Sequence, residues 1–360
     1  MEDNESDMSL QDNKQKVYLT VPGRLCLFGE HTDWVSEYRR MNPNIPPGKA
    51  IVCLVDMQIT AIAEISNFVC FSAEMNGRQY AVQCELSTAS IEKAIIDNPI
   101  FAYVLSTCSS MINRFGVGGI DIKIISNTLP VKKGLSSSAA ICILVARAFN
   151  RVYELNMPVE EEVEIAYISE RNINSMCGKM DHIVAYSNTL SLMEFELDKT
   201  IITSLSATCD IYMVWIDLKY EKDTKRILGD LNKCYPFPDN KISTDVQEAF
   251  GENSLMIVDS ALHLIREGDN KGLGELMTSA YNLFSKKILP ASSALYSPRL
   301  DRVLKDPSVI SNIFGGKGVG SLGDGSVQAI AKNKDSQRKL CDYLNSMPNV
   351  YAAYPVTIRR

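Results

Sequence analysis

The segment that decides the fold is PVKKGLSSSAA, residues 130–140. Before it, isoleucines at positions 120, 122 and 124 alternate with polar residues, a pattern that predicts a half-buried strand. After it, residues 136–155 are apolar over a length that suits a buried helix. Backbone N–H groups that are free at the start of a helix, together with its aligned peptide dipoles, form an anion-binding site. The segment therefore predicts a strand, a loop that can hold an anion, and a helix.

The composition of the loop supports the same prediction. Gly134 lets a phosphate group approach the backbone closely, Ser136 to Ser138 supply hydroxyl donors and a candidate magnesium ligand, and Lys132 and Lys133 add positive charge. The loop differs from the G-x-x-x-x-G-K-[ST] phosphate loop, since no Lys-Ser or Lys-Thr pair follows its glycine. Taken alone, the serines also suit a simpler role, which is to cap the N-terminus of a core helix.

Length and composition exclude several classes of protein. A chain of 360 residues predicts one large or two medium domains. The net charge of -6 argues against a nucleic-acid-binding surface over much of the molecule. The longest apolar run, residues 140–146, is far shorter than the roughly 20 residues of a membrane helix. Ten cysteines without a C-x-x-C pair are typical of a cytoplasmic protein with reduced thiols. We therefore expect a cytoplasmic protein that binds neither nucleic acid nor membrane.

The remaining patterns predict an α+β protein, because strands and helices mix without strict βαβ alternation. Residues 1–16 are acidic and polar and predict a flexible tail, which is neither a secretory signal nor a membrane anchor. We expect one domain at 17–200 and a second at 201–360. The expected strands are 17–21, 51–57, 59–70, 189–195, 211–217, 326–331 and 350–356. The expected helices are 159–171, 255–266, 273–286 and 335–344. Residues 315–325 are expected to form a glycine-rich turn.

Three segments in this order resemble the signatures of the GHMP small-molecule kinases: PGRLCLFGEHTDW at 22–34, PVKKGLSSSAA at 130–140 and GGKGVGSLGDG at 315–325. This family includes galactokinases, homoserine kinases, mevalonate kinases and phosphomevalonate kinases. The resemblance implies an N-terminal α+β domain and a C-terminal ferredoxin-like domain, with the active site between them. It also implies that the chain uses ATP and Mg²⁺.

The first of these segments resembles the galactokinase and sugar-1-kinase branch, which shares its Gly-Glu-His-Thr-Asp sequence at 29–33. Glu30 and Asp33 can accept hydrogen bonds from sugar hydroxyls, and His31 can donate or accept according to its tautomer. Three polar side chains in one short turn would be costly to bury without a polar ligand or other partners. The alternative is structural, with Glu30 and Asp33 capping the next helix and His31 satisfied in the core.

A further segment, SMCGKMDH at 175–182, resembles the galactokinase C-G-x-M-D-Q sequence, with His182 in place of glutamine. The resemblance implies that Asp181 faces the hydroxyl that attacks the γ-phosphate, either as a general base or only by orienting it and stabilising charge. It places Arg24 beside Asp181, where a guanidinium keeps the carboxyl ionised and compensates phosphoryl charge. Gly178 would be a point where the backbone approaches the sugar. A surface aspartate is the alternative for Asp181.

The nucleotide and metal sites also follow from the resemblance. Ser138, or alternatively Ser137, and Glu170 are the expected magnesium ligands, although Glu170 lies one position closer to Asp181 than the corresponding glutamate of galactokinases does. The residues expected to bind ATP are Lys133, Gly134, Leu135, Ser136, Ser137, Ser138 and Ala139.

We therefore expect a sugar kinase of carbohydrate metabolism that phosphorylates a monosaccharide, at the anomeric hydroxyl, and that is a monomer or a weak dimer. Two alternatives stay open: a mevalonate-type isoprenoid kinase, and a sensor that binds sugar and ATP without turnover. Three departures from the family pattern leave the sugar unspecified. The third glycine segment is spread widely, residues 34–50 are long and basic, and KDTKR at 222–226 stands where galactokinases carry a tyrosine that reaches the sugar.

Overall fold

The computed structural model describes residues 16–75, 77–197 and 199–360, so the predicted tail at 1–16 lies outside the described residues apart from Lys16. The first half of the chain builds a seven-stranded sheet with the order β4-β3-β5-β2-β6-β7, and β1 pairs with β2 outside this path. Its strands are β1 (Val17–Phe28), β2 (Gly48–Ser66), β3 (Val69–Met75), β4 (Arg78–Cys84), β5 (Gly119–Asn127), β6 (Leu190–Glu196) and β7 (Lys199–Ser204).

The long strand β2 organises this sheet. It pairs with β1 along one edge, while the other edge pairs with β6 at 48–53 and with β5 at 59–66. The prediction of two separate strands at 51–57 and 59–70 was wrong, because pairing with β1 on both sides of a register shift at 56–57 keeps β2 a single strand that ends at Ser66. Strand β1 likewise continues beyond the predicted 17–21 and carries the first motif segment to Phe28.

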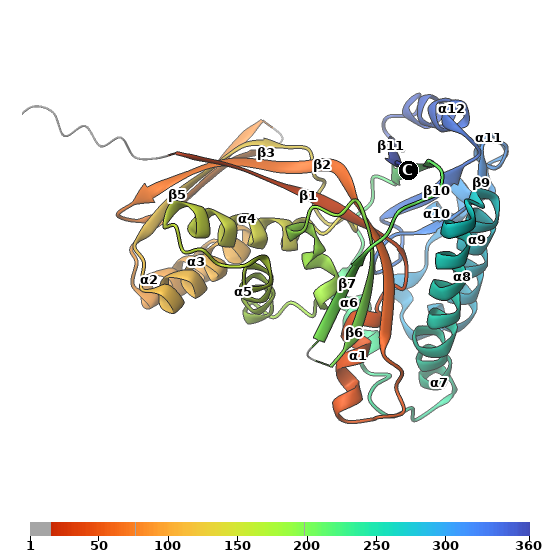
Figure 1. Cartoon of the computed structure of the whole chain (residues 1–360), viewed down its shortest axis with the longest axis horizontal. Coiled ribbons are helices and arrows are strands. Elements are labelled where there is room, and N and C mark those ends of the chain that lie inside the picture. The colour runs from red at the N-terminus through yellow and green to blue at the C-terminus, as the bar shows by residue number, and fades with distance from the viewer. Residues whose placement is uncertain (1–15, 76, 198) are drawn as a thin grey trace, which may run out of the picture.

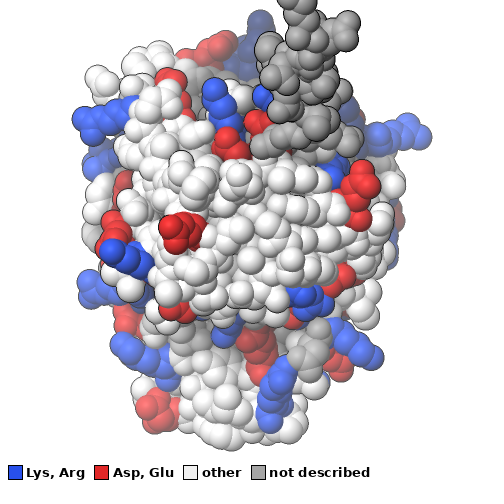
Figure 2. All heavy atoms as spheres, turned by 90° about the vertical axis from the view of Figure 1, so that its left-hand side faces the viewer, with Lys and Arg blue, Asp and Glu red and all other residues white. Residues whose placement is uncertain are grey.

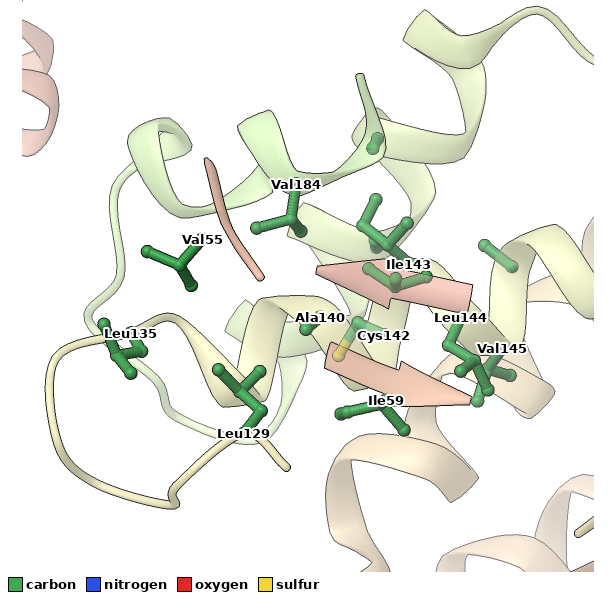
Figure 3. Packing of buried hydrophobic residues seen from close by; sticks show 14 of the residues in the cluster. Val55, Ile59, Leu129, Leu135, Ala140, Cys142, Ile143, Leu144, Val145 and Val184 are labelled. Carbon is green, nitrogen blue, oxygen red and sulfur yellow. The ribbon is translucent and has the colours of Figure 1, made fainter. Parts of the chain in front are cut away.

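Helices cover one side of this sheet (Figure 1). They are α2 (Thr88–Asp97), α3 (Ala102–Phe115), α4 (Ser137–Val152) and α5 (Val159–Asn172). The buried helix predicted after the serine loop is confirmed as α4, because its residues 142–146 have no exposed surface. Figure 3 shows Cys142, Ile143 and Val145 among other core residues, including Ile59 on β2. This packing fixes the start of α4, and hence the serine loop, against the sheet.

The second half of the chain builds an antiparallel sheet with the order β11-β8-β10-β9. Its strands are β8 (Ile211–Asp217), β9 (Ile313–Gly318), β10 (Ser326–Ala331) and β11 (Ala352–Ile358). The helices between β8 and β9 are α6 (Thr224–Asn232), α7 (Lys241–Glu248), α8 (Ser254–Glu267), α9 (Asn270–Lys287), α10 (Pro298–Lys305) and α11 (Pro307–Ile310), and α12 (Lys334–Asn345) joins β10 to β11. This arrangement is the predicted ferredoxin-like order.

The structure corrects the prediction for the glycine-rich segment at 315–325. It was expected to be a turn, but its first four residues belong to β9. Small residues are needed there because α9 packs closely on the strand: a Cβ atom added at Gly315 would lie 1.9 Å from the carbonyl oxygen of Gly274. Only residues 319–325 form a loop.

Residues 35–50 and 220–250 pack against each other. The short helix α1 (Thr32–Glu37) and the turn after it bring Trp34 and Tyr38 to the second half of the chain. Tyr38 stacks on Tyr235 with ring centroids 5.2 Å apart, and Trp34 contacts Tyr235 and Phe250 edge to face. This aromatic cluster ties the first motif to the second half, whereas the domain boundary near residue 200, which lies within β7, stays a prediction.

One end of the molecule has few charged side chains in its middle (Figure 2). Helices α2 and α3 lie toward this end (Figure 1). Ile96 on α2 and Ile100 in the 3-10 turn between α2 and α3 are exposed. Among the described residues, no single helix has the length and apolarity to cross a membrane, and only the bent pair Thr88–Asp97 and Pro99–Phe115 meets these two criteria together.

Candidate active site

A cavity of about 680 Å³ is lined by residues from both halves of the chain. It contains most of the side chains predicted from the motifs, namely Arg24, Glu30, His31, Asp33, Gly134, Ser136, Ser137, Ser138, Glu170, Gly178 and Asp181. Three predicted nucleotide residues do not line it. The side chains of Leu135 and Ala139 are buried in the core, and Lys133 pairs with Asp217 at 2.7 Å.

The serine loop enters the cavity in a turned conformation. Lys132, Gly134 and Ser136 all have positive φ angles, and α4 begins at the next residue, Ser137. Gly134 faces a narrow space, because a Cβ atom added there would lie 3.0 Å from Cγ1 of Val319 and 3.5 Å from Nζ of Lys222. Gly134 therefore packs directly against Val319 and close to the ammonium group of Lys222. The N–H groups of the first turn of α4, which begins three residues later, are the candidate donors of an anion site.

Arg24 and Asp181 form a charged pair beside this loop. Arg24 lies on β1 and Asp181 on the 3-10 helix Lys179–Ala185, and the guanidinium donates to the Asp181 carboxylate. Arg24 also donates through Nη1 to the carbonyl oxygen of Gly134 at 3.0 Å. Burial acts to raise the pKa of Asp181, but the positive charge of Arg24, together with its hydrogen bond and smaller contributions from other groups, holds this pKa below its ordinary value. Asp181 is therefore an ionised carboxylate at neutral pH, fixed next to the anion site.

The acidic turn after β1 supplies hydrogen-bonding groups on another wall. The turn needs Gly29, whose φ is +92° and where a Cβ atom would lie 2.1 Å from the carbonyl oxygen of Lys49. His31 accepts a hydrogen bond at Nδ1 from Nε1 of Trp34 at 3.0 Å. Burial, and next the charge of Lys222, lower the pKa of His31 to about 3, so the ring is neutral. Its proton therefore sits on Nε2, which is buried without a hydrogen-bond partner among the described residues.

Asp33 and Gly178 are in direct contact. The carboxylate of Asp33 accepts a hydrogen bond from the backbone N–H of Met180 at 3.1 Å. A Cβ atom added at Gly178 would lie 2.0 Å from Oδ2 of Asp33, so only glycine leaves room for this carboxylate. Burial, and next the charge of Asp181, raise the pKa of Asp33 to about 6. The glycine expected near a sugar thus also positions an acidic group on the cavity wall.

Two lysines near the cavity escaped the sequence analysis. Lys317 on β9 has no exposed surface and forms an ion pair with Glu30, which is also buried. Lys222 lies on the segment between β8 and α6, lines the cavity and is 7% exposed. A lysine between glycines on a strand is a signal that could have pointed to Lys317. Lys222 stands in a polar stretch, KDTKR, and has no such signal.

The expected magnesium ligands both line the cavity. Glu170 is buried, accepts a hydrogen bond from Ser175 at 3.5 Å, and lies with Oε2 3.3 Å from Nε2 of the buried His182. The part of the chain that the structure describes has no group of three His, Cys, Asp or Glu residues that could hold a metal ion by itself. A metal at Ser138 and Glu170 would thus need oxygen ligands from a bound molecule or from water.

The opposite part of the cavity is apolar. Its walls come from β2, β3, β5 and the helices, and include Ile59, Phe71, Phe101, Val104, Ile124 and Ile141. An apolar pocket that opens onto convergent polar groups suits a ligand with a flat apolar part and a charged part. The cavity therefore combines apolar walls, a candidate anion site at the start of α4, an ionised carboxylate and a hydrogen-bonding turn.

Comparison with known proteins agrees with this geometry. Residues 79–189 match the family model of the GHMP kinases N terminal domain. A galactokinase of Thermotoga maritima is 23% identical over 300 residues, which cover 72% of this chain and 75% of that protein.

Solved structures with the same fold include kinases of different substrates. A galactokinase of Lactococcus lactis, crystallised with galactose, has a TM-score of 0.73 and 15% identity, with 97% of this chain and 95% of that chain covered. A mevalonate kinase of Methanococcus jannaschii has a TM-score of 0.70 and 18% identity, with 97% and 99% covered. The chain therefore has the two-domain α+β fold of these kinases, and the fold by itself does not choose between their substrates.

Proposed function

The chain belongs to the GHMP kinase family of phosphotransferases, and we propose that within it the chain transfers the γ-phosphate of ATP to a hydroxyl of a monosaccharide, the anomeric hydroxyl. One observation supports this most: the Arg24–Asp181 pair, the serine loop and the acidic turn share one cavity. An ionised carboxylate beside an anion site is the arrangement that phosphoryl transfer to an alcohol requires.

The nucleotide would lie along the cavity. Its phosphates would meet the free N–H groups at the start of α4. The apolar part of the cavity would take the adenine base. Ser138 and Glu170 would hold Mg²⁺, which when bound would supply positive charge that neutralises part of the phosphate charge.

The sugar would lie between the acidic turn and Asp181. Neutral His31 has a buried N–H at Nε2 to donate to a sugar oxygen, and Asp33 can accept from a sugar hydroxyl. Asp181 would accept the proton of the attacking hydroxyl or orient it. Arg24 would hold Asp181 ionised and would offset charge on the phosphoryl group, since it also contacts the carbonyl of Gly134 in the serine loop.

A substrate panel tests the proposal. Purified protein would be assayed for ADP release with ATP, Mg²⁺ and a set of monosaccharides, with mevalonate as the comparison substrate. Turnover of a sugar with mevalonate inert supports the proposal, whereas turnover of mevalonate alone would select an isoprenoid kinase. Binding of ATP and sugar by calorimetry without any ADP would select a sensor.

A substitution at Asp181 tests the roles of the residues. The amide of Asp181→Asn keeps the shape but cannot hold charge, so we expect turnover to be abolished while sugar affinity stays within several-fold. Asp335→Asn, on an exposed part of α12, is the matched control and should leave turnover unchanged. Turnover in Asp181→Asn close to that of the control would contradict the assignment.

A further inference from the structure

Lys222 differs from the other cations of the cavity wall. Arg24 and Lys132 line the same cavity and are each paired with a carboxylate, Asp181 and Glu221 respectively. Lys222 has no ion pair within the described part of the chain, and its ammonium group donates one hydrogen bond, to the carbonyl oxygen of Val319 at 2.7 Å. An ammonium has three donors, so this cavity-lining residue has donors left that could bind a ligand.

The surroundings of Lys222 leave a channel for its side chain. Glycines border its length: a Cβ atom at Gly325 would lie 3.0 Å from its Cδ, and one at Gly323 would lie 3.7 Å from its Cβ. Near the tip, a Cβ atom at Gly134 would lie 3.5 Å from Nζ and one at Gly320 would lie 3.8 Å away. The second and third motif segments thus meet around this one lysine, which reaches from the second half of the chain to the serine loop of the first.

The ammonium also lies within electrostatic range of the catalytic pair. Burial, and next the charge of Arg24, lower the pKa of Lys222 to about 7, while Asp181 and Glu30 act in the opposite direction. Keeping an ammonium buried without a carboxylate is costly. An anion bound in front of Lys222 would remove this cost. Its position beside Gly134 is where the terminal phosphate of a nucleotide seated on α4 would lie.

We propose that Lys222 is a catalytic residue that binds the terminal phosphate of the nucleotide and, together with Arg24, stabilises the phosphoryl group during transfer. The inference rests on the proposed function and goes beyond it, because it adds a cation from the second half of the chain. The ammonium would contact oxygens of the γ-phosphate, and no such group is present once the nucleotide is ADP.

The test compares the affinities of two nucleotides. Calorimetry with Mg²⁺ measures the binding of the β,γ-imido analogue of ATP and of ADP to the wild-type protein, to Lys222→Met and to Lys225→Met. Lys225 is an exposed lysine on the neighbouring α6, so its substitution removes the same charge outside the cavity. In Lys222→Met we expect the analogue to bind about 10- to 100-fold more weakly, with ADP within about twofold. Lys225→Met should change neither affinity.

Kinetics supply the second readout. With the sugar found by the panel, Lys222→Met should lower kcat by about 10²–10³-fold, a loss typical of removing one group that stabilises transition-state charge. The KM for the sugar should stay within several-fold. If Lys222→Met does not fold, Lys222→Gln takes its place, because its amide can still donate to the carbonyl of Val319.

Two results would overturn the inference. If Lys222→Met weakens the binding of the analogue and of ADP equally, or weakens neither, Lys222 does not bind the terminal phosphate. A raised KM for the acceptor with unchanged nucleotide affinities would assign Lys222 to an anionic group on the acceptor instead. The nucleotide measurements need no acceptor, so they stay decisive even if every sugar proves inert and the proposed function itself fails.

Discussion

The ion pair between Glu30 and Lys317 gives a prediction whose size follows from burial. Glu30 lies in the acidic turn of the first half of the chain and Lys317 on β9 of the second, so the pair connects the two halves inside the protein. Neither side chain has more than 2% of its surface exposed. Removing one partner of a buried pair leaves an uncompensated charge and costs about 3–5 kcal/mol of unfolding free energy.

The two single substitutions should differ. Lys317→Met leaves the carboxylate of Glu30, which lines the cavity and can gain water, so we expect a loss of about 3 kcal/mol. Glu30→Gln leaves the ammonium of Lys317, which has no exposed surface, so we expect a loss of about 5 kcal/mol. The double variant leaves no charge behind and should lose much less than the sum, with a coupling of at least about 2 kcal/mol.

Urea unfolding followed by two probes measures these losses, and coincidence of the two transitions checks that the halves unfold together. The control is another pair between the halves, Lys49 and Asp259 at 3.0 Å, because Asp259 is largely exposed. Lys49→Met should cost less than about 1 kcal/mol. Additive losses at Glu30 and Lys317, or single losses no larger than that of the control, would refute the reasoning.

Two further predictions concern the carboxyl of Asp33. Its folded pKa of about 6 lies above the ordinary 3.8, so the folded protein binds this proton more tightly and its stability falls as the pH rises from about 4 to 6. Asp33→Asn should lose this dependence, so that between pH 3 and pH 7 the variant gains about 3 kcal/mol of stability relative to wild type. Thermal melts of both proteins at the two pH values measure this difference, and parallel pH profiles would contradict the prediction. Gly178→Ala places a methyl group 2.0 Å from Asp33, so it should lower the stability of the fold by about 1–3 kcal/mol and raise the KM for the sugar. The control Gly229→Ala, on α6 with open space around it, should be neutral or slightly stabilising in the same melts. Equal effects of the two substitutions would exclude the steric argument.

The sequence predicted those elements whose signals are local. The strand at 211–217, the strand at 326–331 and the helix after the serine loop follow from apolar runs bounded by polar or glycine residues, and all three are present. The continuous strand β2 could not be predicted from its own residues, because pairing with β1 extends it through a polar stretch. The same holds for β9, since its Gly315 is required by the close approach of α9 at Gly274 and not by a turn.

The residues of the candidate site likewise divide into those that local motifs predicted and those that only tertiary contacts reveal. Motif segments predicted the serine loop, the acidic turn and Asp181, and the structure brings them to one cavity, although their roles stay predictions. The two buried lysines beside these groups come from far along the chain: Lys317, which pairs with Glu30, is 287 positions from it, and Lys222 contacts a loop 97 positions away. A lysine in a polar stretch has the pattern of a solvated residue, and only tertiary contacts show that it is buried.

Two of the departures from the family pattern, the widely spaced glycines at 315–325 and the KDTKR sequence at 222–226, lie in the second half of the chain. They therefore have one structural cause. Widely spaced glycines in the third segment leave the channel that Lys222 occupies, and Lys222 itself belongs to the segment that replaces the tyrosine-containing one. Within the described residues, Arg24 is compensated by Asp181 and Lys317 by Glu30. Lys222 is then the buried cation left for an incoming phosphate, together with the N–H groups of α4. A polyphosphate carries several negative charges, so one lysine and a helix terminus leave most of them unbalanced, and nucleotide binding by this cavity would depend on Mg²⁺ for the remainder.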